Sequence, residues 1–185
     1  MARWLGVFGV FGVFGVFGTA ALVAACTTAR GTADTPADRP AGSTTLALDA
    51  NATLVYVTDG DTIGVEVDGT EERVRLIGID TPETKKPDTP VQCFGPEATA
   101  FTTSLLPEGT ALHLERDVEA RDAYGRLLAY VYRAGDGLFV NMEIIGQGYA
   151  RPLTIPPNVA HADEFVAAAR NAEATDLGLW AGCSG

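Results

Sequence analysis

Two short stretches in the first half of the chain concentrate side chains that could do chemistry. Residues 59–62 read DGDT, residues 80–83 read DTPE, and Arg75 lies between them. Carboxylates and a guanidinium are the groups that metal binding, proton transfer and phosphate binding need. Each stretch also has a purely structural interpretation: DGDT suits a hairpin turn, and DTPE suits an Asp N-cap with Pro and Glu in a first helical turn. Chemistry is indicated only if the fold brings both stretches together.

The segments around these stretches are typical of consecutive β-strands. Residues 53–58 and 62–67 are rich in β-branched side chains and flank the DGDT turn, so they predict a hairpin. Residues 72–79 alternate apolar and other side chains, which predicts a third strand with Ile77 on its outward side. These three strands would form a meander.

The remainder of the domain predicts two more strands and three helices. The five strands, with a helix inserted between the third and the fourth, indicate an α+β, mainly β fold: a five-stranded OB-fold-type barrel with three helices. In this fold Asp61 would begin one strand, Asp80 would end another, and Arg75 would lie inside the second, so all three are expected at one rim of the barrel. The predicted elements are a helix at 96–106, strands at 110–115 and 126–133, and helices at 138–147 and 161–175.

The N-terminal segment predicts export. Arg3 is followed by a long uncharged run, and small residues stand directly before Cys26, as in the lipobox of a bacterial lipoprotein. We therefore expect a signal peptide of the lipoprotein type at residues 1–25, lipidation of Cys26, a flexible linker at 26–45 and a folded domain at 46–185. The protein would be extracytoplasmic and attached to the cell membrane through its lipid. An uncleaved membrane anchor is the alternative, because the apolar run is long enough to span a bilayer.

Charge and cysteine content narrow the function classes. The formal net charge is −11, with 13 Lys and Arg against 24 Asp and Glu. This balance argues against a protein that holds nucleic acid by bulk electrostatics, although a bound metal and a few arginines would supply positive charge locally. Apart from Cys26, Cys93 and Cys183 form an even pair in an exported chain, and a disulfide between them is the expected state. Two free thiols and half of a metal site are the alternatives.

Six segments in register resemble the staphylococcal nuclease (thermonuclease) family. They read VTDGDT, RVRLIGIDTPET, CFGPEATAF, DAYGRLLAYVY, VNMEIIGQGYAR and LGLW, and they cover about residues 53–180. The resemblance implies a calcium-dependent nuclease that hydrolyses phosphodiester bonds of DNA, RNA or both and leaves 3′-phosphates. We expect a monomer. The resemblance also implies roles for particular residues: Asp61, Asp80 and the backbone carbonyl of Thr81 as Ca²⁺ ligands, Arg75 and Arg126 at the scissile phosphate, Glu83 as general base, and Tyr124 and Lys85 as further substrate contacts.

Elementary chemistry agrees with these implied roles. Ca²⁺ takes oxygen ligands, and a cation with two fixed guanidiniums can stabilise the charge that develops on a phosphodiester. Tyr124 has a structural alternative, since it precedes a strand, and Lys85 could equally be a solvated loop residue. The chain departs from the family at Ala123, where a lysine is expected, and at residues 152–157, which replace an aromatic pair expected near a base. Base stacking is therefore in question.

A few other residues are expected to be structural. Asn141 is predicted as a buried hydrogen-bond anchor and Trp180 as a core plug, and neither His113 nor His161 is assigned to catalysis. Two rival functions remain, namely a catalytically silent OB-fold module that binds nucleic acid and an envelope interaction module. The leftover acid Glu83 argues against a pure binder, which needs no general base.

Overall fold

A computed structural model describes residues 47–85 and 90–183 of the chain. The expected signal peptide, Cys26 and the whole of the expected linker lie outside the described residues. Within the two described ranges, no helix is long and apolar enough to cross a membrane.

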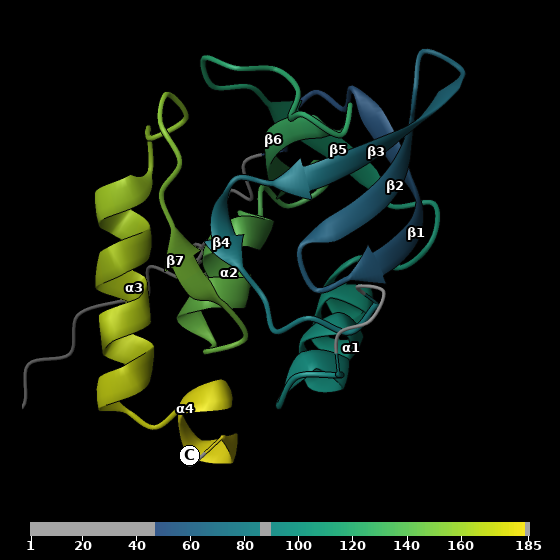
Figure 1. The fold of residues 1–185 in the computed structure, drawn as a ribbon. Helices are drawn as coiled ribbons and strands as arrows, with labels where there is room; N and C mark the ends of the chain where they lie inside the picture. The colour runs from purple at the N-terminus through teal and green to yellow at the C-terminus, as the bar shows by residue number, and fades with distance from the viewer. Residues whose placement is uncertain (1–46, 86–89, 184–185) are drawn as a thin grey trace, which may run out of the picture. The chain divides into compact units, whose positions relative to one another are not determined.

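Five strands close into a barrel, which confirms the predicted fold class (Figure 1). The chain forms β1 (Ala52–Asp59), β2 (Thr62–Val67), β3 (Thr70–Leu76), β5 (Ala111–Glu115) and β6 (Leu127–Arg133), and their order around the barrel is β1-β2-β3-β6-β5. The first three strands form the expected antiparallel meander, and β6 closes the sheet by pairing parallel to β3 and antiparallel to β5. The strands' β-branched residues fill the interior, where Ile63, Val65, Val74 and Val131 have no exposed surface.

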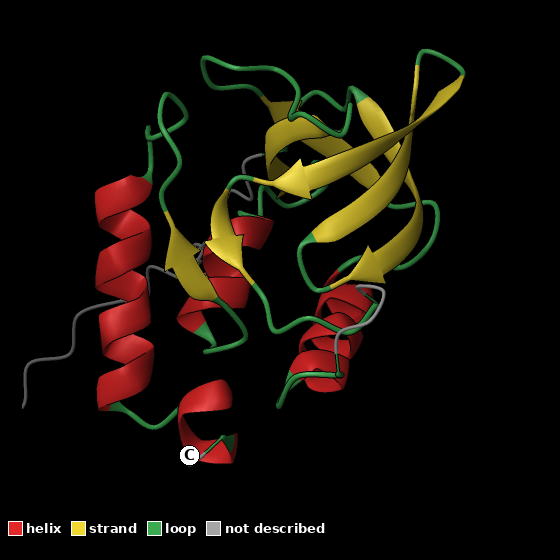
Figure 2. Cartoon of the chain, in the orientation of Figure 1, coloured by secondary structure: helices red, strands yellow, loops and turns green. Residues whose placement is uncertain are grey.

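The helices lie below and to the left of the barrel in the view of Figure 2. The three that the sequence predicts are α1 (Gly95–Leu105), α2 (Val140–Gly146) and α3 (Ala162–Ala174), and a short α4 (Leu179–Gly182) follows them. Helix α1 contacts β1, whereas α2 lies between β6 and α3. The stretch 80–83 begins no helix, so the interpretation of DTPE as a helix start is wrong.

The predicted third strand is wrong in being continuous, because the chain breaks at Ile77. Strand β3 ends at Leu76, and Ile77 is 6% exposed rather than outward-facing. Gly78 follows with φ +82, and a Cβ there would lie 2.2 Å from the ring of Phe165, so the chain turns where only glycine fits. A separate strand β4 (Gly78–Asp80) then pairs with β7 (Arg151–Leu153), which the sequence did not predict.

Asn141 confirms the expectation of a buried anchor. It has no exposed surface, its Nδ2 donates to the Ile77 carbonyl at 2.9 Å, and its Oδ1 accepts from the Val131 amide at 2.9 Å. These bonds fix the chain at Ile77, between the end of β3 and the start of β4. The prediction for Trp180 is wrong, because Leu179 is the buried residue of α4 and the Trp180 ring instead lies 4.3 Å from the guanidinium of Arg151.

Cys93 and Cys183 form the expected disulfide, with their Cα atoms 5.9 Å apart. The bond joins the segment before α1 to the residue after α4. Gly182 packs beside it on the ring of Phe94, where a Cβ would approach to 2.8 Å. The C-terminal end of the described chain is thus held against the start of α1.

Candidate active site

The turn between β1 and β2 holds Asp61 in a fixed orientation. Its carboxylate is 9% exposed, and Oδ2 accepts hydrogen bonds from the Thr81 amide at 2.8 Å and the Thr81 hydroxyl at 3.0 Å. Its backbone carbonyl accepts from the Leu76 amide, and its own amide donates to Asp59 Oδ1 at 3.2 Å. The two acidic stretches of the sequence are therefore in direct contact through Asp61 and Thr81.

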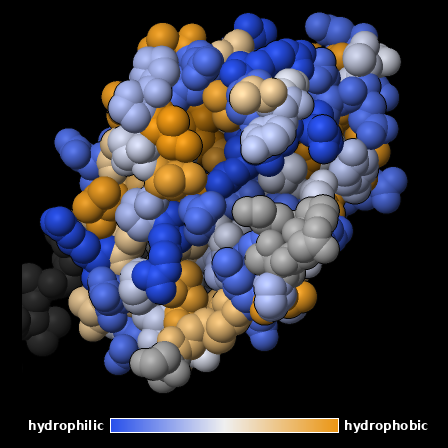
Figure 3. Space-filling model, in the orientation of Figure 1, coloured by the Kyte–Doolittle hydropathy of each residue, from blue (hydrophilic) through white to orange (hydrophobic). Residues whose placement is uncertain are grey.

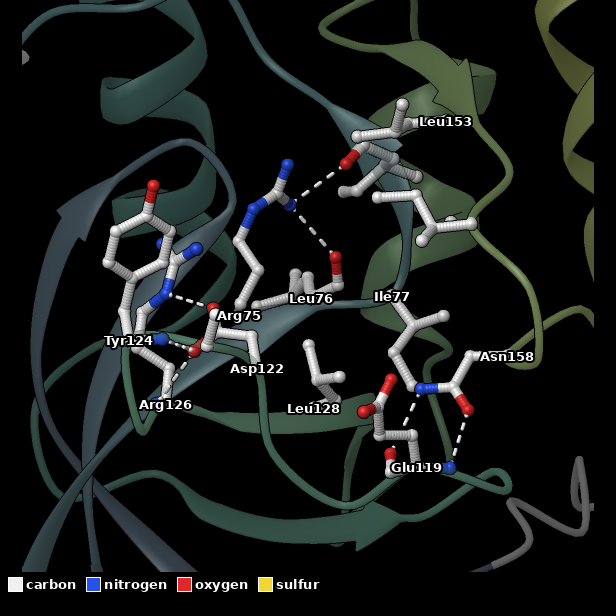
Figure 4. A pocket seen from close by; sticks show the side chains of 14 residues that line it. Arg75, Leu76, Ile77, Glu119, Asp122, Tyr124, Arg126, Leu128, Leu153 and Asn158 are labelled. Atoms are coloured by element: carbon white, nitrogen blue, oxygen red, sulfur yellow. Dashed lines mark hydrogen bonds and ion pairs between the residues drawn. The ribbon is translucent and has the colours of Figure 1, made fainter.

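Arg75 bridges the same two stretches, and Figure 4 shows its guanidinium with its bonds to two backbone carbonyls. Its Nη1 donates to the carbonyls of Leu76 and Ile79 at 2.9 and 2.8 Å, which aligns the guanidinium along the turn from β3 to β4. Its Nη2 lies 3.2 Å from Asp61 Oδ2 and 3.1 Å from Asp80 Oδ1. The two carboxylates thus converge on one positively charged atom.

Glu83 is anchored at the base of the loop that leads to α1. Its amide donates to Gln92 Oε1 at 2.9 Å, and its carbonyl accepts from the Gln92 amide at 2.9 Å. Its Oε1 accepts from the amides of Thr84 and Lys85 at 2.9 and 2.8 Å. Gln92 is the neighbour of the disulfide residue Cys93, so the position of Glu83 is tied to the covalently fixed start of α1.

Arg126 is oriented by Asp122, which lies four residues earlier in the loop before β6. Asp122 Oδ1 accepts from the amides of Tyr124 and Arg126, and Oδ2 accepts from Arg126 Nε at 2.7 Å. Burial would raise the pKa of Asp122, but its hydrogen bonds from Arg126 outweigh burial and lower that pKa. The Tyr124 ring is 79% exposed and has the Arg126 guanidinium 5.5 Å from its centre.

Arg75 and Arg126 both line one pocket of about 460 Å³. Figure 4 shows both arginines among the side chains that line it, together with the apolar residues Leu128 and Ile77. On the face seen in Figure 3, apolar side chains gather in a hollow bordered by hydrophilic ones. Leu153 and Ile155 line the pocket and are 36% and 60% exposed. A flat, partly apolar group attached to a phosphate would fit this combination.

The carboxylates at the site carry unbalanced negative charge. Burial, together with the charge of Asp61, raises the pKa of Asp59 to about 6. Partial desolvation and the charges of Asp61 and Glu83 raise the pKa of Asp80, and Arg75 only partly offsets them. A divalent cation would relieve this repulsion.

The oxygen donors at this site suit a hard cation whose remaining coordination positions are filled by other ligands. Among residues 47–85 and 90–183, no three His, Cys, Asp or Glu side chains form a group that could hold a metal by themselves. Asp61 and Asp80 nevertheless converge on the Arg75 Nη2 atom, and Thr81 is in direct contact with Asp61 through its amide and hydroxyl. Ca²⁺ accepts such a site, because it takes oxygen ligands in flexible geometry, including water and substrate oxygens.

The sequence comparisons agree with this geometry. A family profile described as "Staphylococcal nuclease homologue" matches residues 73–182. The thermonuclease of Staphylococcus intermedius is 46% identical over 124 residues, covering 67% of this chain and 72% of that protein. The chain belongs to the staphylococcal nuclease family. Endonuclease YncB of Bacillus subtilis is 41% identical over 132 residues, covering 70% of this chain and 61% of that protein. The chain is accordingly a hydrolase of the nuclease class.

The structure brings most of the residues expected from the staphylococcal nuclease resemblance together. Asp61, Asp80, Thr81 and Arg75 are linked by direct contacts, and Arg126 shares the pocket with Arg75. Lys85 is exposed, and its backbone amide donates to Glu83 Oε1 at 2.8 Å.

Two supporting residues of this nuclease site escaped the sequence analysis. Asp122 begins the turn at residues 122–126, where its carboxylate accepts backbone amides and pairs with Arg126, and an Asp before a Gly-containing turn could have indicated this role. Gln92 carries no such signal, because its contact with Glu83 depends on the path of the intervening loop.

Proposed function

We propose that this member of the family is a calcium-dependent phosphodiesterase that cleaves DNA, RNA or both. The convergence of Asp61 and Asp80 on a single cationic atom carries the proposal, because it shows a carboxylate pair that is already arranged around positive charge. Asp61, Asp80 and the carbonyl of Thr81 would hold Ca²⁺. Bound there, the ion would supply Lewis-acid stabilisation to a phosphate oxygen.

The chain's own residues would perform the remaining steps. Arg75 and Arg126 point into one pocket and would bind the non-bridging oxygens of the scissile phosphate, where a planar guanidinium forms paired hydrogen bonds. Glu83 would accept a proton from the attacking water, since it is the remaining carboxylate near Asp59 and Asp80 once the metal ligands are assigned. By family resemblance, the products would carry 3′-phosphates.

The pocket beside the arginines would receive the nucleoside attached to the scissile phosphate. Tyr124 offers an exposed ring at its edge, whereas Leu153 and Ile155 offer aliphatic surface where the family pattern suggests aromatic residues. Stacking on an aromatic ring contributes about 1 to 3 kcal/mol per base. We therefore expect weaker and less base-selective binding than an aromatic pair would give.

We also propose that the protein works outside the cytoplasm, anchored through lipidated Cys26. Support comes from the Cys93–Cys183 disulfide, because such bonds persist mainly in oxidising compartments. The lipobox-like sequence before Cys26 is the second argument.

Two substitutions separate the proposed roles. Glu83→Gln should reduce turnover by a factor on the order of 10² to 10⁴ while Ca²⁺ affinity stays close to that of the wild type. Asp61→Asn should weaken Ca²⁺ binding instead. The measurements are calcium titration calorimetry and cleavage of a defined oligonucleotide. Equal loss of metal affinity in both variants would show that the roles are misassigned, and a wild-type protein that binds oligonucleotide without cleaving it would favour a silent OB-fold module.

A further inference from the structure

Helix α1 presents one polar side chain to the metal-binding turn. The buried residues of α1 are Gly95, Ala98 and Thr102, which follow one another at helical spacing and form its inner face. Gly95 and Ala98 have no side-chain hydrogen-bond donor. Thr102 has one, and it is completely buried, so its hydroxyl needs a partner inside the protein.

The Thr102 hydroxyl does not use the partner that a helix usually offers. Threonines within helices commonly donate to the carbonyl one turn earlier. Two neighbours in α1 do so: Thr99 bonds to the Gly95 carbonyl at 3.1 Å and Thr103 to the Thr99 carbonyl at 2.8 Å. Thr102 instead reaches across to the carbonyl of Gly60, 42 positions away in sequence, at 2.7 Å.

Gly60 is the residue between Asp59 and Asp61, and it has two close neighbours. Besides the Thr102 hydroxyl at its carbonyl, the Thr81 side chain packs beside its Cα and would be only 2.7 to 2.8 Å from a Cβ at position 60. Thr81 in turn donates twice to Asp61 Oδ2. The turn is therefore fixed between a buried hydroxyl on α1 and the second acidic stretch, and its peptide planes have little freedom to rotate.

We infer that Thr102 is a positioning residue for the metal: its hydrogen bond to Gly60 sets the turn that aims the Asp61 carboxylate at the cation. This inference rests on the proposed function. Groups that orient metal ligands without touching the metal commonly alter metal affinity by about 10- to 100-fold when removed. The bond is well suited to that role, because water cannot reach Thr102 and replace the lost donor.

Two substitutions at this position separate the hydrogen bond from packing. Thr102→Val keeps the shape and removes the donor, whereas Thr102→Ser keeps the donor and removes a methyl group. Thr103→Val is the matched control, since Thr103 is an exposed residue of the same helix whose hydroxyl bonds within α1. Ca²⁺ affinity is measured by calorimetry at low temperature, with the melting temperature and the circular dichroism spectrum recorded for each protein.

We expect Thr102→Val to weaken Ca²⁺ binding by about tenfold or more. Thr102→Ser should bind Ca²⁺ nearly as the wild type does even if it melts earlier, and Thr103→Val should bind normally. A folded Thr102→Val protein with wild-type affinity would overturn the inference, because Thr102 would then serve stability alone. If Thr102→Val does not fold, Thr102→Ser decides: affinity that is lost although the hydroxyl is retained would equally overturn it.

The same titrations distinguish a failure of this inference from a failure of the proposed function. A wild-type protein that does not bind Ca²⁺, or an Asp61→Asn variant that binds it unchanged, would contradict the calcium site itself. Normal binding by the wild type, weak binding by Asp61→Asn and normal binding by Thr102→Val would contradict only the role of Thr102.

Discussion

Removing the Cys93–Cys183 disulfide should cost stability without abolishing the active site. The bond joins residues 90 positions apart, and in the chain-entropy model a loop of that length restricts the unfolded chain by about 4 to 5 kcal/mol. For a domain of this size, that corresponds to a fall in melting temperature of roughly 10 to 20 °C. Contacts that survive reduction, such as Leu179 in the core and Gly182 on the ring of Phe94, still hold α4 in place.

The assay compares thermal unfolding of the wild type, oxidised and reduced, with that of a variant carrying both Cys93→Ser and Cys183→Ser. The hydrogen bonds between Gln92 and Glu83 can still form without the covalent bond, and the metal ligands lie away from it, so calcium-dependent cleavage should remain measurable at low temperature. A double variant that melts within about 2 °C of the oxidised wild type would refute the entropic reasoning. Two freely alkylated thiols in non-reduced exported protein, detected by mass spectrometry, would refute the bond itself.

Three further predictions concern charge, the pocket and the N-terminus. The pKa of Asp59 is raised from 3.8 to about 6, so ionised Asp59 disfavours the folded state above that pH. In chelator, Asp59→Asn should stabilise the protein by about 1 kcal/mol near pH 8, a figure that allows for solvent screening at this partly exposed group. The gain in stability should disappear toward about pH 4. Urea unfolding of both proteins across this pH range tests the prediction, and a difference in stability that does not change with pH would contradict it. Leu153→Trp should lower KM for oligonucleotides with little change in kcat, and an unchanged KM would mean that no base reaches Leu153. Fatty-acid labelling should tag the wild type and not Cys26→Ser, whereas an untagged full-length wild type would indicate an uncleaved anchor.

Local sequence signals predicted the barrel well because each strand is specified by its own residues. Alternating apolar positions and the DGDT turn set the β1–β2 hairpin, and they also placed Asp61 correctly at the start of β2. The break at Ile77 was not predictable in this way. It depends on Phe165, which is distant in sequence and occupies the space beside Gly78, and on Asn141, which donates to the buried carbonyl of Ile77.

The site shows the same division between local and long-range causes. The acids and Arg75 are recognisable by type and spacing, and their convergence follows from the meander. Asp80, however, reaches the site on the two-stranded β4–β7 sheet rather than on the barrel, and β7 carried no recognisable strand pattern because it is three residues long and contains Pro152. Thr102 was likewise hidden, since nothing in a helical sequence shows that a threonine will bond outside its helix.

Cleavage of a defined oligonucleotide by the purified protein, with added Ca²⁺ and with excess chelator, tests the proposed function most directly. We expect cleavage in Ca²⁺, none in chelator, recovery when Ca²⁺ is restored, and products whose mass corresponds to 3′-phosphate ends. The Glu83→Gln protein serves as the control for contaminating nucleases, since its turnover should be lower by a factor on the order of 10² or more. Full activity of the wild type in excess chelator would contradict the calcium-dependent site at Asp61 and Asp80.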